Sequence, residues 1–404
     1  MGNLWWRIGG SLMAGLFVAY LDRTNLSVAL PTLSRDYGFA GAGFAVTASW
    51  ALTIFLIGYA LANIAGGLLT RRQDPKTVVV WCFAAWSAAT VLIGLTRSVT
   101  VLLLCRFVLG VAEGIYWPQQ SRFAKAWFAP EMRTRANGVI QFYGQYLALA
   151  VGFLILTPLY DAFGWRLLFF VTGGIGLLVV VPLYLAALRP EAEAPFRDQP
   201  TPRTPGRALT LAALGGPRFL LLLFSYVTQG MLFWGITLWI PLAVRSLGFT
   251  GAWQAFASAL PYAAAVVLAV PLTRLSDRTG RRALIAALGL LLPGLLMVAL
   301  PLVPSGPAKL ALITVALGSY AGSYTPNVWS ILQASVAPEA VGAAAGIVNG
   351  LGAGGGGTLA GFLVGLLYRA SGSYMSGFVV LGVLVILGGA ALLIYARPRP
   401  AGGG

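Results

Sequence analysis

Apolar segments of about twenty residues recur along the whole chain, and this feature restricts the possible fold more than any other. A helix needs about 20 apolar residues to cross a hydrocarbon core of about 30 Å. Because no water reaches the backbone groups there, such segments must pair those groups internally as helices. Only 9% of the 404 residues are charged, against roughly a quarter in a soluble domain. We therefore expect an all-α polytopic membrane protein surrounded by a lipid bilayer.

Twelve such segments are expected, in two sets of six. They cover residues 8–33, 44–69, 77–95, 99–127, 136–160, 167–188, 219–244, 252–272, 283–302, 308–333, 341–367 and 374–396. The one long polar stretch between segments, at 189–218, is rich in proline and charge and is typical of a linker. The sequence therefore predicts an N-terminal six-helix bundle at 1–188, a linker at 189–218 and a C-terminal six-helix bundle at 219–404.

The basic residues predict how the chain is oriented. One side of the predicted topology holds 19 lysines and arginines and the other holds six. Because cytoplasmic loops carry the excess of positive charge, both termini and the linker are expected in the cytoplasm of a cell with a plasma (inner) membrane. This topology also accounts for the net charge of +16, so no nucleic-acid partner is expected. We expect the protein to work as a monomer.

The composition gives no sign of a metal or an organic cofactor. The chain has no histidine, and its two cysteines, Cys82 and Cys105, lie inside apolar segments, which argues against both a metal site and a disulfide framework. The glycine-rich run at 352–357 lacks the Lys-Ser/Thr that completes a phosphate-binding loop. Close helix packing or a flexible gate is the better explanation of that run. No cofactor and no enzymatic activity are therefore expected.

A partial internal repeat supports the division into two halves. The loop after the eighth segment contains Asp277 and Arg278, followed by Thr-Gly-Arg-Arg. It resembles the signature of the major facilitator superfamily, and the resemblance extends over the whole chain. That resemblance implies twelve helices in two bundles and a cytoplasmic gate that uses Asp277 and Arg278. In the first copy, Arg71 replaces the usual acid and Asp74 replaces a glycine. Either Asp74 takes over the gating role or the first-half gate is weaker.

The first segment contains two adjacent charged residues, Asp22 and Arg23. Burying such a group in a bilayer costs at least about 2.5–3 kcal/mol, so a functional reason is the default. Tyr20, Arg23 and Ser27 are three and four residues apart and share one helix face, whereas Asp22 points elsewhere. We interpret the shared face as the lining of a cavity, with Arg23 available to an anion. The alternatives are a structural ion pair or a helix end at the outer interface.

The fourth segment contains Arg106 and Glu113, which are seven residues apart and therefore on one helix face, with Gly110 between them. About 10 Å of helix separates them, so each is expected to pair with a group on another helix. Burial disfavours the charged form of a carboxyl group, which suits Glu113 to carry a proton. A polar network that only packs helices together is the alternative.

The segments at 20–27, 106–114 and 164–166 narrow the resemblance to one branch of the superfamily, the anion:cation symporters. This branch includes bacterial sugar-acid carriers of the hexuronate and galactonate type. The resemblance implies proton coupling and substrate binding at the positions of Asp22 and Arg23, and again at those of Arg106 and Glu113. We assign proton coupling to Asp22 and Glu113, and substrate binding to Arg23 and Arg106.

The same resemblance places four further residues near the substrate, in addition to Tyr20 on the cavity face. They are Tyr59, Gln145, Trp329 and Asn349. For Gln145 and Asn349, a helix-bridging role is an equal alternative. Tyr59 and Trp329 are commonly packing residues, and only the resemblance favours a binding role for them.

The sequence as a whole predicts proton-coupled symport of an organic anion, such as a sugar acid or another small carboxylate, by alternating access. An anion exchanger or an efflux pump on the same fold is the nearest alternative. An integral-membrane enzyme is disfavoured because the membrane acids are isolated and histidine is absent.

Overall fold

The chain is helical throughout the residues that the computed structural model describes, which are 5–41, 43–70, 73–129, 139–196, 214, 216–336 and 341–397. The helices are η1 (Trp5–Gly10), α2 (Ser11–Asp36), α3 (Phe44–Leu69), α4 (Pro75–Leu95), α5 (Val99–Trp127), η2 (Val139–Tyr143), α7 (Gly144–Ile175), η3 (Gly176–Val180), α8 (Val181–Ala187), η4 (Glu191–Glu193), α9 (Pro217–Ser246), α10 (Gly251–Thr279), α11 (Arg282–Val298), η5 (Leu300–Leu302), α12 (Gly306–Ser323), α13 (Thr325–Ser335), α14 (Val341–Asn349), η7 (Gly350–Gly356), α15 (Gly357–Ser371) and α16 (Tyr374–Tyr395). This confirms the predicted all-α class.

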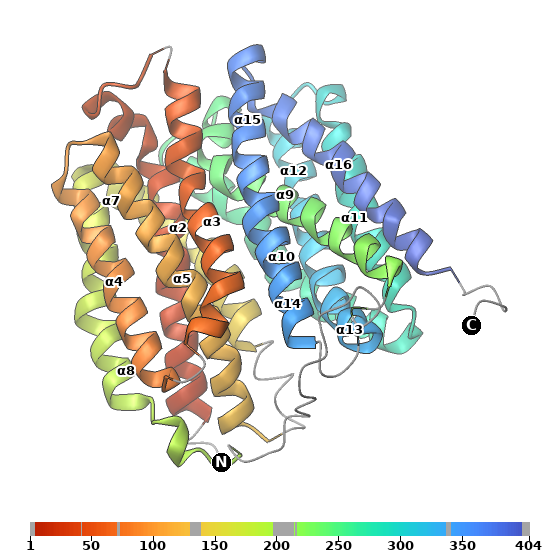
Figure 1. Cartoon of the computed structure of the whole chain (residues 1–404). Coiled ribbons are helices and arrows are strands. Elements are labelled where there is room, and N and C mark those ends of the chain that lie inside the picture. Colours follow the sequence, from red (N-terminus) through yellow and green to blue (C-terminus); the bar gives the residue numbers. More distant parts are fainter. Residues whose placement is uncertain are drawn as a thin grey trace.

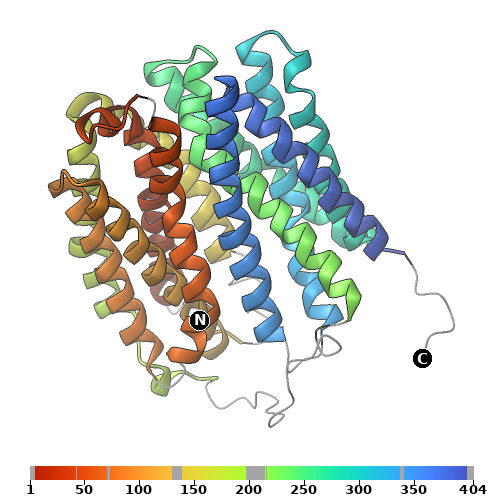
Figure 2. The same ribbon diagram turned by 45° about the horizontal axis from the view of Figure 1, so that its top comes forward.

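The long helices lie side by side in two groups (Figures 1 and 2). Helices α2 to α8, drawn red to yellow-green, lie together, and helices α9 to α16, drawn green to blue, lie beside them. The groups meet where α7 packs on α10, and where α3 packs on η7 and α15. The predicted linker at 189–218 falls mostly outside the described residues, so the exact domain boundaries stay a prediction.

Twelve membrane-crossing helices can be traced within the described ranges. Nine segments are long and apolar enough to cross a bilayer. One of these, Gly144–Glu193, contains two crossings, because Gly164 has φ +78° and interrupts the helix. The other two crossings are more polar or broken: α2 carries Asp22 and Arg23, and the helix that ends at Ser323 resumes at Thr325. At 1.5 Å per residue, the 26 residues of α2 still span about 39 Å.

The Gly-Trp-Arg sequence at 164–166 fixes the turn between two crossings. Gly164 supplies the positive φ that other residues rarely adopt. Trp165 Nε1 then donates a hydrogen bond to Asp36 Oδ2 (2.7 Å). Arg166 Nη1 donates to the carbonyl oxygens of Gly94 (2.8 Å) and Thr96 (3.2 Å). The motif therefore ties the ends of three helices together.

Glycine allows close contact between the two groups of helices. A Cβ atom added to Gly361 on α15 would lie 1.9 Å from Thr53 Cγ2 on α3, and one added to Gly365 would lie 1.9 Å from Ser49 Oγ. A Cβ atom on Gly354 in η7 would lie 2.5 Å from Ala60 Cβ. We call these contacts between α3 and the η7–α15 segment the glycine seam. The glycine-rich run in the sequence belongs to this packing surface.

Both cysteines are free and buried, with Cys82 8% and Cys105 5% exposed. Over the described part of the chain, no three side chains of His, Cys, Asp or Glu gather in a group that could hold a metal ion.

Candidate functional site

Arg23 on α2 forms a buried ion pair with Glu113 on α5. Both Nε and Nη2 of Arg23 bond to Glu113 Oε2, and the two side chains are 2% and 1% exposed. The guanidinium carbon also lies 4.4 Å from the ring centroid of Tyr20 and 5.4 Å from that of Trp234. A cation over an aromatic face is stabilised by the ring quadrupole. An acid and aromatic rings therefore enclose this arginine.

Residues of both helix groups meet beside Arg23. The Tyr59 ring on α3 lies 5.3 Å from the Arg23 guanidinium carbon, and its hydroxyl accepts a hydrogen bond from Asn349 Nδ2 on α14 (3.0 Å). Tyr20 stacks on Trp234 of α9 with a centroid distance of 6.5 Å and an interplanar angle of 6°. The predicted site residues Tyr20, Arg23, Tyr59 and Asn349 are therefore neighbours at the boundary between the two groups.

Asp22 and Arg106 are adjacent, but they do not form an ion pair. Arg106 Nη1 donates to the backbone oxygen of Asp22 (3.3 Å), Nε donates to the Ala51 oxygen (3.3 Å), and the guanidinium lies 4.5 Å from the Phe55 ring centroid. Neither carboxyl oxygen of Asp22 accepts a hydrogen bond of ordinary geometry from any described residue, although the Thr172 hydroxyl is close. Asp22 is fully buried. A carboxyl group without partners is much less costly to bury when it carries a proton.

The remaining predicted binding residues, Gln145 and Trp329, are both half-buried. Gln145 lies in the first turn of α7, next to Tyr146. Trp329 on α13 packs edge-on against Tyr226 of α9, with a centroid distance of 5.5 Å. Neither is among the residues that contact Arg23 or Glu113 in the described hydrogen bonds and ring contacts.

A second polar connection joins the two helix groups, and it was not predicted from the sequence. Tyr146 Oη donates to Tyr320 Oη on α12 (3.5 Å), which also accepts from Gln229 Nε2 on α9 (2.6 Å). Trp234 beside Arg23 was also missed. Gln229 could have indicated this connection, because it is a polar amide in an otherwise apolar helix. Aromatic residues in such a helix carry no distinguishing pattern.

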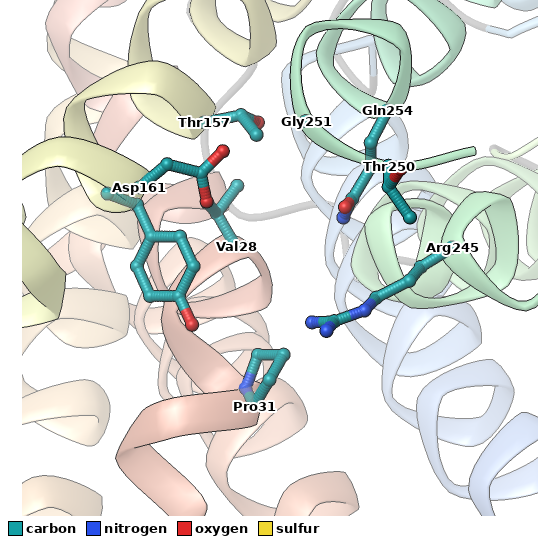
Figure 3. A pocket seen from close by; sticks show the side chains of 9 residues that line it. Val28, Pro31, Thr157, Asp161, Arg245, Thr250, Gly251 and Gln254 are labelled. Atoms are coloured by element: carbon teal, nitrogen blue, oxygen red, sulfur yellow. The ribbon is translucent and has the colours of Figure 1, made fainter.

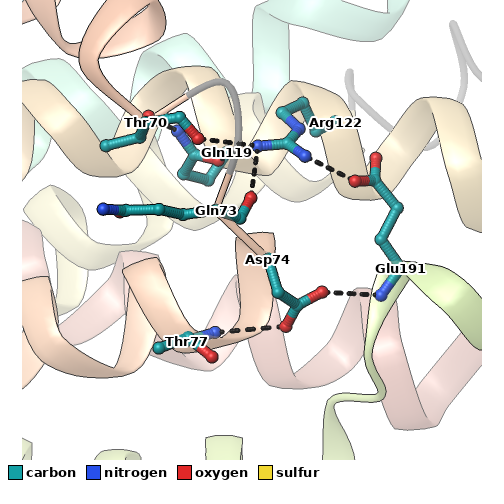
Figure 4. Close-up of polar contacts among 7 residues, drawn as sticks. All are labelled: Thr70, Gln73, Asp74, Thr77, Gln119, Arg122 and Glu191. Atoms are coloured by element: carbon teal, nitrogen blue, oxygen red, sulfur yellow. Dashed lines mark hydrogen bonds and ion pairs between the residues drawn. The ribbon is translucent and has the colours of Figure 1, made fainter.

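Asp74 has partners on the first group of helices and on the segment that follows α8 (Figure 4). Its Oδ2 accepts from the backbone nitrogen of Thr77 at the start of α4 (3.4 Å), and its Oδ1 accepts from the backbone nitrogen of Glu191 (2.8 Å). The Glu191 carboxylate in turn pairs with Arg122 of α5. Asp74 therefore helps to attach the segment after α8 to the first group.

The second copy of the predicted gate lies at the end of α10. Arg278 is exposed there, and Gly280 ends the helix in the left-handed conformation with φ +65°. This explains why the repeat has glycine at that position. The side chain of Asp277, like the whole of Arg71, lies outside the described residues. The gating role of these positions stays a prediction.

Known proteins resemble this chain over nearly its whole length. Residues 12–361 match the family model of the Major Facilitator Superfamily. A protein of Cupriavidus necator named as a sulfoacetate transporter is 29% identical over 93% of this chain and 90% of its own length. A protein of Agrobacterium vitis named as a tartrate transporter is 26% identical over 98% of this chain and 95% of its own length.

A solved structure supports the fold independently. The crystal structure of a bacterial homologue of the human lysosomal transporter Spinster, described as inward-facing and unoccupied, superposes with a TM-score of 0.74. The alignment covers 98% of this chain and 99% of that chain at 20% identity. At this identity the likeness is evidence for the fold alone.

Proposed function

Because the chain belongs to the major facilitator superfamily, and is thus a transporter and not an enzyme, we propose that it is a proton-coupled symporter of a small organic anion. Two relatives are named for transport of sulfoacetate and of tartrate, both small organic anions. The predicted substrate class, a sugar acid or another small carboxylate, is compatible with these names. A buried arginine beside aromatic and amide groups is suited to bind such an anion.

The observation that carries this proposal is the ion pair between Arg23 and Glu113. A substrate carboxylate and the Glu113 carboxylate would compete for one guanidinium. When Glu113 takes up a proton, its charge is lost and Arg23 becomes available to the substrate. Binding of the anion is then linked to binding of a proton, which is the requirement for symport.

The other predicted residues complete the proposed site. Asp22 would carry a second coupling proton, since among the described residues its buried carboxyl group has no ion pair and only the Thr172 hydroxyl lies close to it. Arg106 donates to the backbone oxygen of Asp22 and offers Nη2, which has no partner in the described part of the chain. The groups proposed to contact the substrate are Tyr20, Arg23, Tyr59, Arg106, Gln145, Trp329 and Asn349.

Transport would proceed by alternating access, with the two helix groups rocking about this central site. Asp74, Asp277 and Arg278 would act at the cytoplasmic gate. Both termini would lie in the cytoplasm, since the predicted topology places most basic loops on that side. The protein would act as a monomer in the inner membrane.

The decisive experiment replaces Glu113 by glutamine and measures transport in proteoliposomes. Because glutamine cannot release a proton, Glu113→Gln should lose accumulation driven by a proton gradient, while counterflow exchange of the substrate remains measurable. Glu193→Gln is a suitable control, since Glu193 is an exposed acid whose ion pair with Arg189 is also exposed. Accumulation against a gradient by Glu113→Gln would contradict the coupling assignment.

The substrate itself can be found by a thermal-shift screen of the purified protein against organic anions at two pH values. Transport assays with the anions found then separate symport from its alternatives. An anion exchanger would need a counter-anion and no proton gradient, and an efflux pump would move the anion outward.

A further inference from the structure

A cavity of about 100 Å³ lies between the two helix groups, away from Arg23. Helix α2 provides Val28 and Pro31 on one side, and the start of α10 lies on the other (Figure 3). Arg7 near the start of α2 bonds to the carbonyl oxygen of Ala187 at the end of α8. The cavity is therefore near the opposite end of α2, which the predicted topology places outside the cytoplasm.

The cavity has opposite charges on its two walls (Figure 3). Asp161 on α7 and Arg245 at the end of α9 project into it from opposite sides. Both residues are exposed, so the cavity is accessible from the surface. They do not contact each other, because the three ion pairs of the described residues all lie elsewhere. A solute that accepts hydrogen bonds at one end and donates them at the other would satisfy both side chains.

Neutral polar groups between these charges also offer atoms that can bond to a ligand. Thr157 is only 3% exposed, and its hydroxyl lines the cavity without a hydrogen bond to the described part of the chain. Gln254 donates its Nε2 to the Pro241 oxygen (3.1 Å), which leaves its side-chain oxygen as an acceptor. The Thr157 hydroxyl and the Gln254 side-chain oxygen are therefore free to bond to a polar ligand that enters the cavity.

We propose that this cavity is a second binding site, which takes a small hydroxycarboxylate at the outer mouth of the transporter. The carboxylate would pair with Arg245, and the hydroxyls would donate to Asp161 and to the Gln254 oxygen while accepting from Thr157. A volume of about 100 Å³ is compatible with a ligand of a few carbon atoms. The class of ligand rests on the proposed function, since the same anion would meet this site before Arg23.

The chemistry of the cavity favours a hydroxy acid over its near relatives. A plain carboxylic acid would bond to Arg245 but make no hydrogen bond with Asp161 or Thr157. A second carboxylate on the ligand would face Asp161 and be repelled. An amino acid would place a positively charged ammonium group at this end of the cavity. The cavity has only one acid there, Asp161, beside the neutral groups Thr157 and Gln254, and this mixture suits hydroxyl groups better.

The test measures binding of glycerate, propionate and alanine by calorimetry to the purified full-length protein in lipid nanodiscs. The Arg23→Gln variant removes the central site, so glycerate should still bind to it at one site. Adding Arg245→Gln should weaken that binding roughly tenfold to a hundredfold, as expected for a lost charge-assisted hydrogen bond. Asp161→Asn should reduce the preference for glycerate over propionate. If Arg23→Gln does not fold, Arg245→Gln alone should reduce two glycerate sites to one.

Three results would overturn the site. The first is glycerate binding that does not change with Arg245→Gln, and the second is alanine binding more tightly than glycerate. The third concerns the double variant Asp161→Arg with Arg245→Asp. If it restores transport that each single variant lost, and glycerate does not bind at this cavity, the two residues form an ion pair that holds the helix groups together and not a binding site. Uptake assays separate this test from the proposed function. Absence of anion uptake refutes the function, whereas Arg245-dependent glycerate binding would still support the site.

Discussion

Arg23 is the residue on which the proposed chemistry depends. It contacts Glu113 through two nitrogens and lies over the rings of Tyr20, Tyr59 and Trp234. A planar guanidinium makes both kinds of contact at once, whereas an ammonium group cannot form the forked bond or stack in the same way. Lysine at this position would keep the charge but lose the forked bond and the stacking.

This leads to a prediction for Arg23→Lys. The variant should raise the substrate concentration for half-maximal uptake roughly tenfold to a hundredfold, since a hydrogen bond to a charged group contributes about 1.5–3 kcal/mol. Uptake kinetics in proteoliposomes measure this. Arg35→Lys is the matched control, because Arg35 is exposed on the same helix. Unchanged kinetics in Arg23→Lys would show that the substrate does not bind to this guanidinium.

At the residue scale, the sequence predicts which helix face a side chain lies on better than it predicts which residue that side chain contacts. Helical spacing separates Asp22 from Arg23, and in the structure Arg23 bonds to Glu113 whereas the Asp22 carboxyl group lies close to Thr172. Spacing also requires Glu113 to find its partner on another helix, but it does not identify Arg23 as that partner. Pairing between helices depends on how they pack, and a single sequence contains no record of it. The functional roles assigned to these residues stay predictions.

At the scale of helices, the glycine seam determines how closely the two groups approach. Side chains of α3 fill the space that a Cβ atom on Gly361 or Gly365 would occupy. Small residues at such positions allow dispersion contacts over a long stretch of helix. If the two groups rock during transport, this is a surface that must separate and close again in each cycle.

The seam can be tested with one added methyl group. Gly361→Ala places its Cβ against Thr53 Cγ2, so it should destabilise the protein by about 1–3 kcal/mol and slow uptake. Adding Thr53→Ser removes the obstructing methyl group and should restore both properties. Thermal unfolding and uptake rates measure the effect. Gly174→Ala is the control, since a Cβ there meets nothing within 4 Å. No effect of Gly361→Ala would mean that the seam is not closely packed.

Helix positions were predictable because long apolar runs have few alternatives. The predicted segments 44–69 and 99–127 coincide with α3 and α5. The sequence did not predict the π-helix Gly350–Gly356 or the break between α12 and α13 at Tyr324. Such irregularities keep the backbone bonded within the helix, and they leave the apolar pattern unchanged. Local packing decides where they occur.

At the scale of the whole molecule, the segment after α8 belongs with the first helix group. Glu191 bonds to Asp74 and pairs with Arg122, and the Phe196 nitrogen donates to the Ala126 oxygen (3.1 Å). The described contacts of this segment with the first group therefore reach Phe196, and the domain boundary at residue 188 stays a prediction. The contacts between α3 and the η7–α15 segment could not be predicted, because they join residues about 300 positions apart in the chain.

This suggests a test of the two-bundle organisation. Fragments 1–200 and 201–404, produced together, should assemble and transport substrate, since each contains one complete set of six predicted crossings. Fragments 1–304 and 305–404 are the control, because they divide the second set and should assemble poorly. Co-purification and uptake measure the outcome. Equal recovery of activity from both cuts would argue against two separate bundles.

The burial of Cys82 and Cys105 has a practical consequence. Buried, uncharged thiols react slowly, because the thiolate is the reactive form. The natural chain should therefore serve directly as a silent background for spectroscopic labels. Paired cysteines introduced at Asp161 and Arg245, each carrying a spin label, would report how far the outer mouth opens during turnover.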